Sequence, residues 1–333
     1  MNLLASLLST RPWLLADGAT GTNLFNMGLM SGDAPELWNE QQPEKIAALH
    51  QGFVDAGADI ILTNTFGCNA RRLMLHGAQA RTVELNRLGA EIARGVTAGA
   101  GRPVVVAGSV GPTGDLLVPL GMLTEEEACA VFVDQMRGLK MGGADVAWIE
   151  TMSAMEEIRA AVQAAALVGL PCVVTASFDT AGRTMMGTTP ADFVAFVTAL
   201  PHPPLAIGAN CGVGASDLLA SVLGLTEDNP GVVVVAKANA GIPTVHGDHT
   251  HYSGTPELMG DYARMALDAG ARIIGGCCGT APAHLRAMRA ALEAHQPGLR
   301  PDLGEVVERI GRLVSPPPDL VDRPARETRR RRS

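Results

Sequence analysis

The stretch DAGADIILTNTF, residues 55–66, predicts the end of a helix followed at once by a buried strand. Gly57 is a typical helix stop, and the apolar run after it has the length of a strand. The same order recurs in GGADVAWIET at 142–151 and in DAGARIIGGCCG at 268–279. These runs are nearly continuous rather than alternating, as in parallel strands covered on both faces. The repeat therefore predicts a parallel α/β fold.

Eight such apolar runs occur along the chain, at residues 13–18, 59–66, 104–111, 145–151, 172–179, 204–212, 231–241 and 271–279. Amphipathic segments separate them, and one of these begins with the capping-box pair Thr124 and Glu127. Eight strand–helix units in one chain predict a single-domain (β/α)8 TIM barrel. A doubly wound open sheet is the alternative, but the regular spacing of the units favours the barrel.

The barrel is expected to span residues 1–314. From residue 315 the sequence SPPPDLVDRPARETRRRRS is rich in proline and arginine, which predicts a disordered basic tail over 315–333. The arginine run is most simply a solvated tail, although an anion or nucleic acid is an alternative partner for it.

The overall composition limits the classes of function. Hydrophobic residues make up 47% and charged residues 18% of the 333, which is typical of a globular chain. The net charge of −8 argues against nucleic acid as the main partner. No apolar run reaches the roughly 20 residues of a membrane helix, and the apolar N-terminus lacks the basic start of a signal peptide. The six cysteines have no disulfide-scaffold spacing, so we expect reduced thiols in a cytoplasmic protein.

Polar side chains and cysteines fall repeatedly at the predicted strand ends. In a TIM barrel the active site lies at the carboxyl ends of the strands. The residues placed there are Asp17, Gly18, Thr63, Asn64, Ser109, Glu150, Asn210, Cys211, Asn239, Cys277 and Cys278. They are therefore expected to surround one cavity, with Asn210 and Asn239 orienting the loops that carry the cysteines.

The three cysteines at strand ends predict a metal site. Cys211 ends the sixth strand, and Cys277 and Cys278 end the eighth, which lies close to the sixth in a closed barrel. Three thiolates suit zinc, and three protein ligands leave a fourth position open for a substrate thiol. The alternatives are three buried apolar cysteines, or a disulfide between Cys277 and Cys278.

Six motifs then identify a resemblance to a known family. LLADGATGTNL at 14–24, ADIILTNTFGCN at 58–69, GSVGPTG at 108–114, WIET at 148–151, GANCGVG at 208–214 and GGCCGT at 275–280 occur in the order typical of homocysteine S-methyltransferases. The resemblance covers about residues 10–295. It implies a barrel with Zn²⁺ on the three cysteines and homocysteine as the methyl acceptor.

The resemblance also implies roles for individual residues. Asp17 and Gly18 match a segment that binds homocysteine, and Thr63 matches a polar contact in the same site. Glu150 matches the carboxylate that holds the homocysteine amino group. We therefore predict Asp17 and Glu150 as catalytic residues, and Asn210 as a further residue of the substrate site.

The methyl donor is expected to be a small onium compound. Such a cation favours aromatic neighbours, for which Trp38, Phe66, Phe178 and Tyr252 are the candidates, with Trp38 and Tyr252 in loop-like segments. Thr151 replaces the tyrosine of the animal betaine enzymes. Nevertheless DGATGTNLFNMGL at 17–29 and PELWN at 35–39 resemble bacterial betaine–homocysteine methyltransferases. Betaine is therefore favoured, with S-methylmethionine as the alternative. The chain stops at 333, before the folate and cobalamin modules of a long methionine synthase, which we do not expect here.

Three questions stay open at this stage. A zinc-binding barrel without enzymatic activity is the alternative from another class of function. HGDHTHY, residues 246–252, is expected to form a loop over the cavity, with a second metal site on its histidines and aspartate as the alternative. A homo-oligomer is compatible with the sequence but is not indicated by any particular motif.

Overall fold

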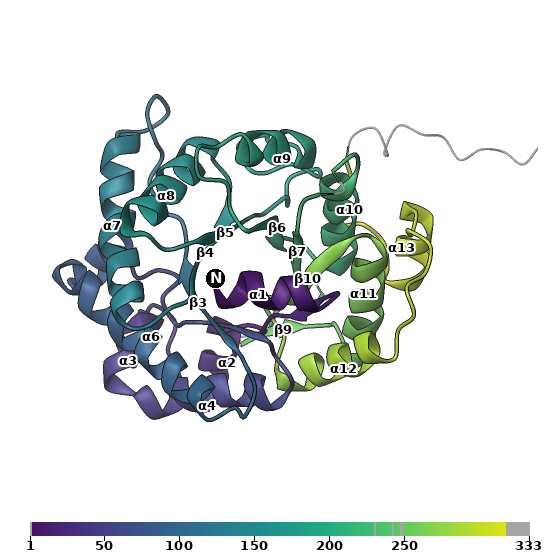
Figure 1. Ribbon diagram of the computed structural model, residues 1–333, viewed down its shortest axis with the longest axis horizontal. Coiled ribbons are helices and arrows are strands. Elements are labelled where there is room, and N and C mark those ends of the chain that lie inside the picture. The colour runs from purple at the N-terminus through teal and green to yellow at the C-terminus, as the bar shows by residue number, and fades with distance from the viewer. Residues whose placement is uncertain (1, 230, 242, 247–248, 318–333) are drawn as a thin grey trace, which may run out of the picture.

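The computed structural model describes residues 2–229, 231–241, 243–246 and 249–317, and it forms a ring of strands enclosed by helices (Figure 1). The barrel strands are β1 (Leu14–Leu15), β2 (Ile60–Leu62), β3 (Val105–Val110), β4 (Val146–Met152), β5 (Cys172–Ala176), β6 (Ala206–Cys211), β7 (Val234–Ala238) and β10 (Ala271–Gly276). All pairs are parallel, in the order β1-β10-β7-β6-β5-β4-β3-β2. A parallel bridge between Ala16 and Ile60 closes the ring. The predicted TIM barrel is confirmed.

The helices are α1 (Leu3–Thr10), α2 (Gly21–Asn26), η1 (Pro35–Leu37), α3 (Trp38–Gln41), α4 (Pro43–Asp55), α5 (Ala70–Leu73), η2 (Met74–His76), η3 (Gln79–Arg81), α6 (Thr82–Ala98), α7 (Glu125–Met141), α8 (Met155–Val168), α9 (Pro190–Thr198), α10 (Ala215–Thr226), α11 (Pro256–Asp268), α12 (Pro282–Glu293) and α13 (Leu303–Arg309). The capping box predicted at Thr124 and Glu127 starts α7. Gly57, with φ +99°, follows the end of α4 as expected for a helix stop.

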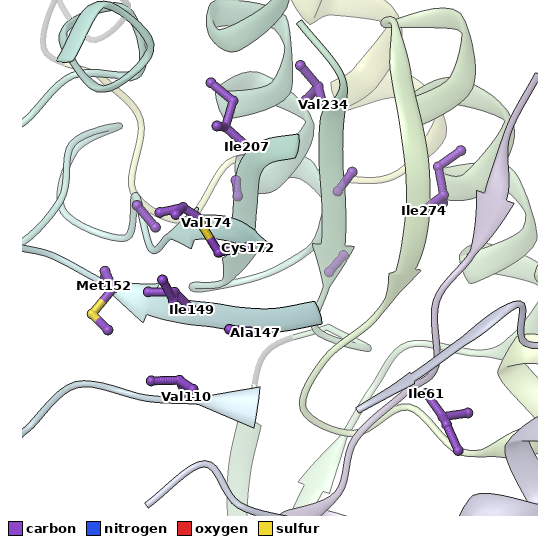
Figure 2. Close-up of a cluster of buried hydrophobic side chains, with 14 of the residues drawn as sticks. Ile61, Val110, Ala147, Ile149, Met152, Cys172, Val174, Ile207, Val234 and Ile274 are labelled. Atoms are coloured by element: carbon purple, nitrogen blue, oxygen red, sulfur yellow. The ribbon is translucent and has the colours of Figure 1, made fainter. Parts of the chain in front are cut away.

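Two apolar layers hold the barrel together. The outer layer lies between strands and helices, and Figure 2 shows some of its side chains, including Ile61, Val174 and Ile274. The inner layer fills the barrel with side chains from alternate strand positions, such as Leu62 and Val235. Because each strand is buried on both faces, its sequence is apolar throughout rather than alternating.

Helix α1 closes the amino-terminal end of the barrel. It crosses the middle of the ring of strands in Figure 1, and its buried Leu4, Leu7 and Leu8 pack against the inner layer. Arg272 ties the end of this helix to the start of β10 by donating to the carbonyls of Leu8 (2.7 Å) and Arg11 (2.6 Å). The carboxyl ends of the strands are therefore the end at which a cavity is available.

The segment predicted as a loop at 246–252 belongs to a hairpin instead. β8 (Pro243–His246) and β9 (His249–Tyr252) pair antiparallel between β7 and α11. The correction has a local cause, because Thr244, Val245 and Thr250 are β-branched residues that favour strands. The alternative metal site on His246, Asp248, His249 and His251 lies outside the part of the chain whose side chains the structure describes.

The carboxyl-terminal segment stays in contact with the barrel as far as the structure describes it. The amides of Val314 and Ser315 donate to the carboxylate of Asp217, and the Ser315 hydroxyl accepts from the amide of Ala181 at 2.7 Å. Residues 318–333, most of the predicted tail, lie outside the described residues. None of the helices described is long and apolar enough to span a membrane.

Candidate functional site

A cavity of about 490 Å³ opens at the carboxyl ends of the strands. Its volume is typical of small-molecule sites. The predicted site residues that line it are Gly18, Thr63, Asn64, Phe66, Ser109, Glu150, Cys211, Cys277 and Cys278. The predicted residues that do not line it are Asp17, Trp38, Asn210, Asn239 and Tyr252.

The three cysteines meet at the inner end of this cavity. Cys211 is the last residue of β6, and Cys277 and Cys278 follow β10, so the intervening β7 sets the distance between them. The sulfur atoms all lie within 4.8 Å of one another. All three are free thiols, so no disulfide joins Cys277 to Cys278. Three sulfurs this close, all facing one cavity, can hold a metal ion with a position left for a substrate.

The environment of the thiols fits a cation. A hydrogen bond with Cys277 lowers the pKa of Cys211, but a hydrogen bond with Cys278 and burial outweigh it. The net effect is a rise in the pKa of Cys211 to about 12. Three thiols packed this closely do not ionise together unless a positive charge offsets their repulsion. A divalent metal supplies that charge. The Cys211 backbone has φ +64°, a conformation that costs energy outside glycine and that turns the thiol toward its partners.

Two asparagines hold the cysteine loops. The Asn210 side chain accepts from the amide of Thr151 (2.9 Å) and from the Thr175 hydroxyl (2.6 Å), and its amide nitrogen lies 3.9 Å from the sulfur of Cys277. Asn210 thus joins the ends of β4, β5 and β6, and it orients the site from behind the cavity wall.

Asn239 and Tyr252 contact the other two cysteines. The amide nitrogen of Asn239 donates to the Gly212 carbonyl (2.6 Å) and lies 3.7 Å from the sulfur of Cys211. The side chain of Tyr252 hydrogen-bonds to Cys278. Its ring lies over Gly279, where a Cβ would come within 2.2 Å of the ring. Tyr252 is therefore placed beside the cysteine cluster rather than in the open part of the cavity.

A buried ion pair, whose lysine lines the cavity, was not predicted from the sequence. Lys237 on β7 donates to Asp17 at 2.7 Å, and both side chains are buried. The second carboxylate oxygen of Asp17 accepts from the amide of Leu62 at 2.7 Å. Burial lowers the pKa of Lys237, but attraction to Asp17 and Glu150 raises it more. The available signal was a lysine inside the apolar run GVVVVAKANAG at 231–241.

Glu150 lies on the cavity wall, close to this ion pair. Its carboxylate accepts from the Ser109 hydroxyl and is 8% exposed. Burial raises the pKa of Glu150, and the charge of Lys237 and the hydrogen bond from Ser109 lower it in part. Thr63 is adjacent, with its hydroxyl accepting from the Ser109 amide at 3.0 Å. A carboxylate and a hydroxyl thus face the cavity together, which is a suitable environment for an ammonium group.

Gly18 allows the chain after β1 to pass close to the end of β10. A Cβ at this position would lie 2.7 Å from the Thr280 hydroxyl and 2.9 Å from the ring of Phe53. The backbone of this segment can therefore reach the cavity only because residue 18 has no side chain.

The predicted aromatic donor contacts are not all at the cavity. Phe66 lines it, with its ring packed on Gly111. Trp38 lies in no loop: it is the first residue of α3, it is buried in the hydrophobic core, and the Lys45 amino group lies 4.5 Å from its ring. The PELWN segment is a helix start, so its large apolar side chain packs inward.

The family model of homocysteine S-methyltransferases matches residues 14–292, which include every barrel strand and all three cysteines. The chain belongs to the homocysteine S-methyltransferase family. It is a methyltransferase by this membership, and the cysteine cluster lies at the carboxyl ends of the strands, the end at which TIM barrels have their active sites.

Individual members of the family agree with this assignment. The methionine synthases of Mycobacterium tuberculosis and Mycobacterium leprae are 32% and 30% identical, over 84% and 86% of this chain. The chain spans about a quarter of the length of these curated relatives. The metallated form of the Escherichia coli homocysteine methyltransferase MmuM superimposes with a TM-score of 0.72 at 26% identity, covering 87% of this chain and 99% of that one.

Proposed function

We propose that this homocysteine S-methyltransferase transfers a methyl group from a small onium donor to homocysteine, with zinc on Cys211, Cys277 and Cys278. The cluster of three sulfurs within 4.8 Å carries the proposal. Zinc suits sulfur ligands in tetrahedral geometry, and when bound it would lower the pKa of a substrate thiol so that the thiolate forms near neutral pH.

The acceptor side of the cavity suits an amino acid that ends in a thiol. Glu150 and Thr63 would hold the ammonium group, and backbone groups near Gly18 would hold the carboxylate, so that the thiol reaches the cysteine cluster. Lys237 and Asp17 would act indirectly, because their ion pair holds a positive charge close to the Glu150 carboxylate. Asn210, Asn239 and Tyr252 would keep the cysteine loops in position.

The methyl transfer needs no organic cofactor. The new S–CH₃ bond forms as the bond between the methyl group and the donor nitrogen or sulfur breaks. The bonding electron pair stays on the donor, and the thiol proton is released to solvent. The protein contributes alignment of the two substrates, which removes much of the entropic cost of bringing them together. Methionine as the product agrees with the name methionine synthase of the mycobacterial relatives.

Betaine is the donor that we favour, because residues 17–29 and 35–39 resemble bacterial betaine enzymes. S-methylmethionine is the alternative. Phe66 supplies an apolar surface for the onium methyl groups at the cavity wall. We place the protein in the cytoplasm, where its six free thiols would stay reduced.

The test is methionine formation from homocysteine by the zinc-loaded protein, with betaine and S-methylmethionine in parallel and methylcobalamin as a third donor. Turnover with betaine is expected. Turnover with S-methylmethionine alone, or with methylcobalamin alone, would show that betaine is not the donor and would leave homocysteine as the acceptor. Homocysteine binding without turnover on any donor would instead favour a zinc-binding barrel with a regulatory role.

A further inference from the structure

Arg72 brings a positive charge to the outer part of the cavity. It lies in the short helix α5, where Asn69 caps the helix by accepting from the amides of Arg71 and Arg72, at 3.1 Å each. The two arginines then diverge. Arg71 forms an ion pair with Asp115 at 2.5 Å, whereas Arg72 lines the cavity. His76, one turn later in η2, lines the same part of the cavity.

The Arg72 guanidinium has no protein partner among the residues that the structure describes. No hydrogen bond or ion pair of its side chain occurs there, although the neighbouring arginine is paired. The flanking positions are glycines. A Cβ at Gly67 would lie 3.4 Å from the Nε atom, and a Cβ at Gly114 would lie 3.3 Å from Nη1. The guanidinium thus passes close to two glycine backbones, and the Glu36 carboxylate lies on the Gly67 side, where a Cβ at Gly67 would come within 2.9 Å of it.

Glu36 is the acidic residue beside it, and it is already engaged. Its carboxylate accepts from the Gly67 amide at 2.7 Å. Burial raises the pKa of Glu36, while the charges of Arg72 and His76 lower it from a distance without an ion pair. A half-buried guanidinium without a contact partner, in a ligand cavity, has all of its side-chain donors available for a ligand.

We propose that Arg72 binds the carboxylate of the methyl donor, so that the donor substrate is a zwitterion with an onium methyl at one end and a carboxylate at the other. The inference rests on the proposed function and narrows its donor class. Arginine and carboxylate form two parallel hydrogen bonds, which fix the orientation as well as the position of a small ligand. The acceptor binds at the inner end, so a donor held at Arg72 directs its methyl group inward past Phe66.

This subsite accepts betaine and S-methylmethionine, since each carries a carboxylate. It rejects onium compounds of similar size that lack one, such as choline and tetramethylammonium. Such a cation would lack the carboxylate that Arg72 binds, so it would lose the two parallel hydrogen bonds and meet the positive charge of the guanidinium instead.

The experiment compares Arg72→Met with Arg71→Met. Both replace an arginine of α5 by an uncharged side chain of similar length, but only Arg72 lines the cavity. We expect Arg72→Met to raise the donor KM by about 10- to 100-fold, because a charged contact with two hydrogen bonds is lost. The Kd for betaine, measured by calorimetry with homocysteine present, should rise by the same factor. The homocysteine KM should stay within about twofold, and Arg72→Lys should recover part of the loss. Arg71→Met should bind the donor as the unaltered protein does.

Equal donor affinity in Arg72→Met and Arg71→Met would overturn the inference, as would choline turnover comparable with that of betaine in the unaltered protein. The calorimetric comparison requires no catalysis. If the protein binds betaine through Arg72 yet forms no methionine, the proposed function fails while the carboxylate site stands. If methionine forms equally well in both variants, the proposed function stands and the carboxylate site fails.

Discussion

The inner and outer halves of the cavity are built from different parts of the fold. The inner half consists of side chains at strand ends, namely Glu150, Cys211, Lys237, Cys277 and Cys278, and most of them are fixed by hydrogen bonds or by each other. The outer half consists of residues from connecting segments, among them Phe66, Arg72 and His76 between β2 and α6, and Asp33 and Glu36 between β1 and α4. The inner half is defined by the barrel, and the outer half by these connections.

This difference teaches where chemistry and specificity are located. The parallel strand pairing fixes the positions of the inner residues. Cys211 of β6, for example, is paired with Ala238 of β7. No such pairing controls the connection after β2. A shared reaction is therefore expected to depend on the inner half, and the choice of donor on the outer half.

The largest effect is expected from the cysteine cluster. Cys211→Ser should lose the bound zinc and reduce methionine formation to background, because two thiolates and a hydroxyl hold zinc far more weakly. Metal content by elemental analysis and turnover are measured together. Cys129→Ser, on α7 outside the cavity, is the control and should keep both. A metal-free Cys211→Ser protein with full activity would refute the mechanism.

Lys237→Met should cause the next largest effect, on the stability of the inner half. It leaves Asp17 buried without its cation, at a cost of about 3–5 kcal/mol in the free energy of unfolding. The double variant with Asp17→Asn should recover part of this loss. Because its neighbours raise the pKa of Lys237, the stabilisation that depends on the lysine charge is lost as pH rises through that raised value. Burial raises the pKa of Asp17, so the ion pair is also lost on acidification, once Asp17 is protonated. Denaturant unfolding of the unaltered protein and of the single and double variants checks this. Equal free energies of unfolding for Lys237→Met and the unaltered protein would contradict it.

Glu150→Gln should separate the two halves kinetically. Loss of the charge opposite the substrate ammonium should raise the homocysteine KM about 10- to 100-fold and leave the donor KM nearly unchanged. Burial raises the pKa of Glu150, so this carboxylate becomes protonated at a higher pH than an ordinary glutamate does. On acidification, the unaltered protein should therefore begin to lose homocysteine affinity above the usual pKa of a carboxyl group. Glu150→Gln should lack this part of the pH dependence. A rise in the donor KM alone would place Glu150 in the outer half.

The smallest effect on function is expected at Trp38. Because this residue packs in the core and does not line the cavity, Trp38→Phe should leave the donor KM within about twofold and lower stability by roughly 1–3 kcal/mol. Phe66→Leu is the matched aromatic change at the cavity wall and should raise the donor KM. If Trp38→Phe impaired donor binding more than Phe66→Leu, the division into two halves would be wrong on the donor side.

The same division explains what could be predicted from the sequence. The eight strands were found because each is buried on both faces, and Cys211 and Cys277 were found because they end strands in glycine-rich turns. Trp38 was misplaced because a loop and a short helix start have similar local sequences. Arg72 and Lys237 were missed for opposite reasons. Arg72 lies in a connection whose path has no periodic signal, and Lys237 is a single charge within a run that is otherwise apolar and was predicted only as a strand.

Helix α1 limits how molecules can enter and leave the cavity. Since it closes the amino-terminal end of the barrel with Leu4, Leu7 and Leu8, a ligand of the cavity has only the opposite end to use. Under the proposed function, both substrates and both products would therefore share one entrance.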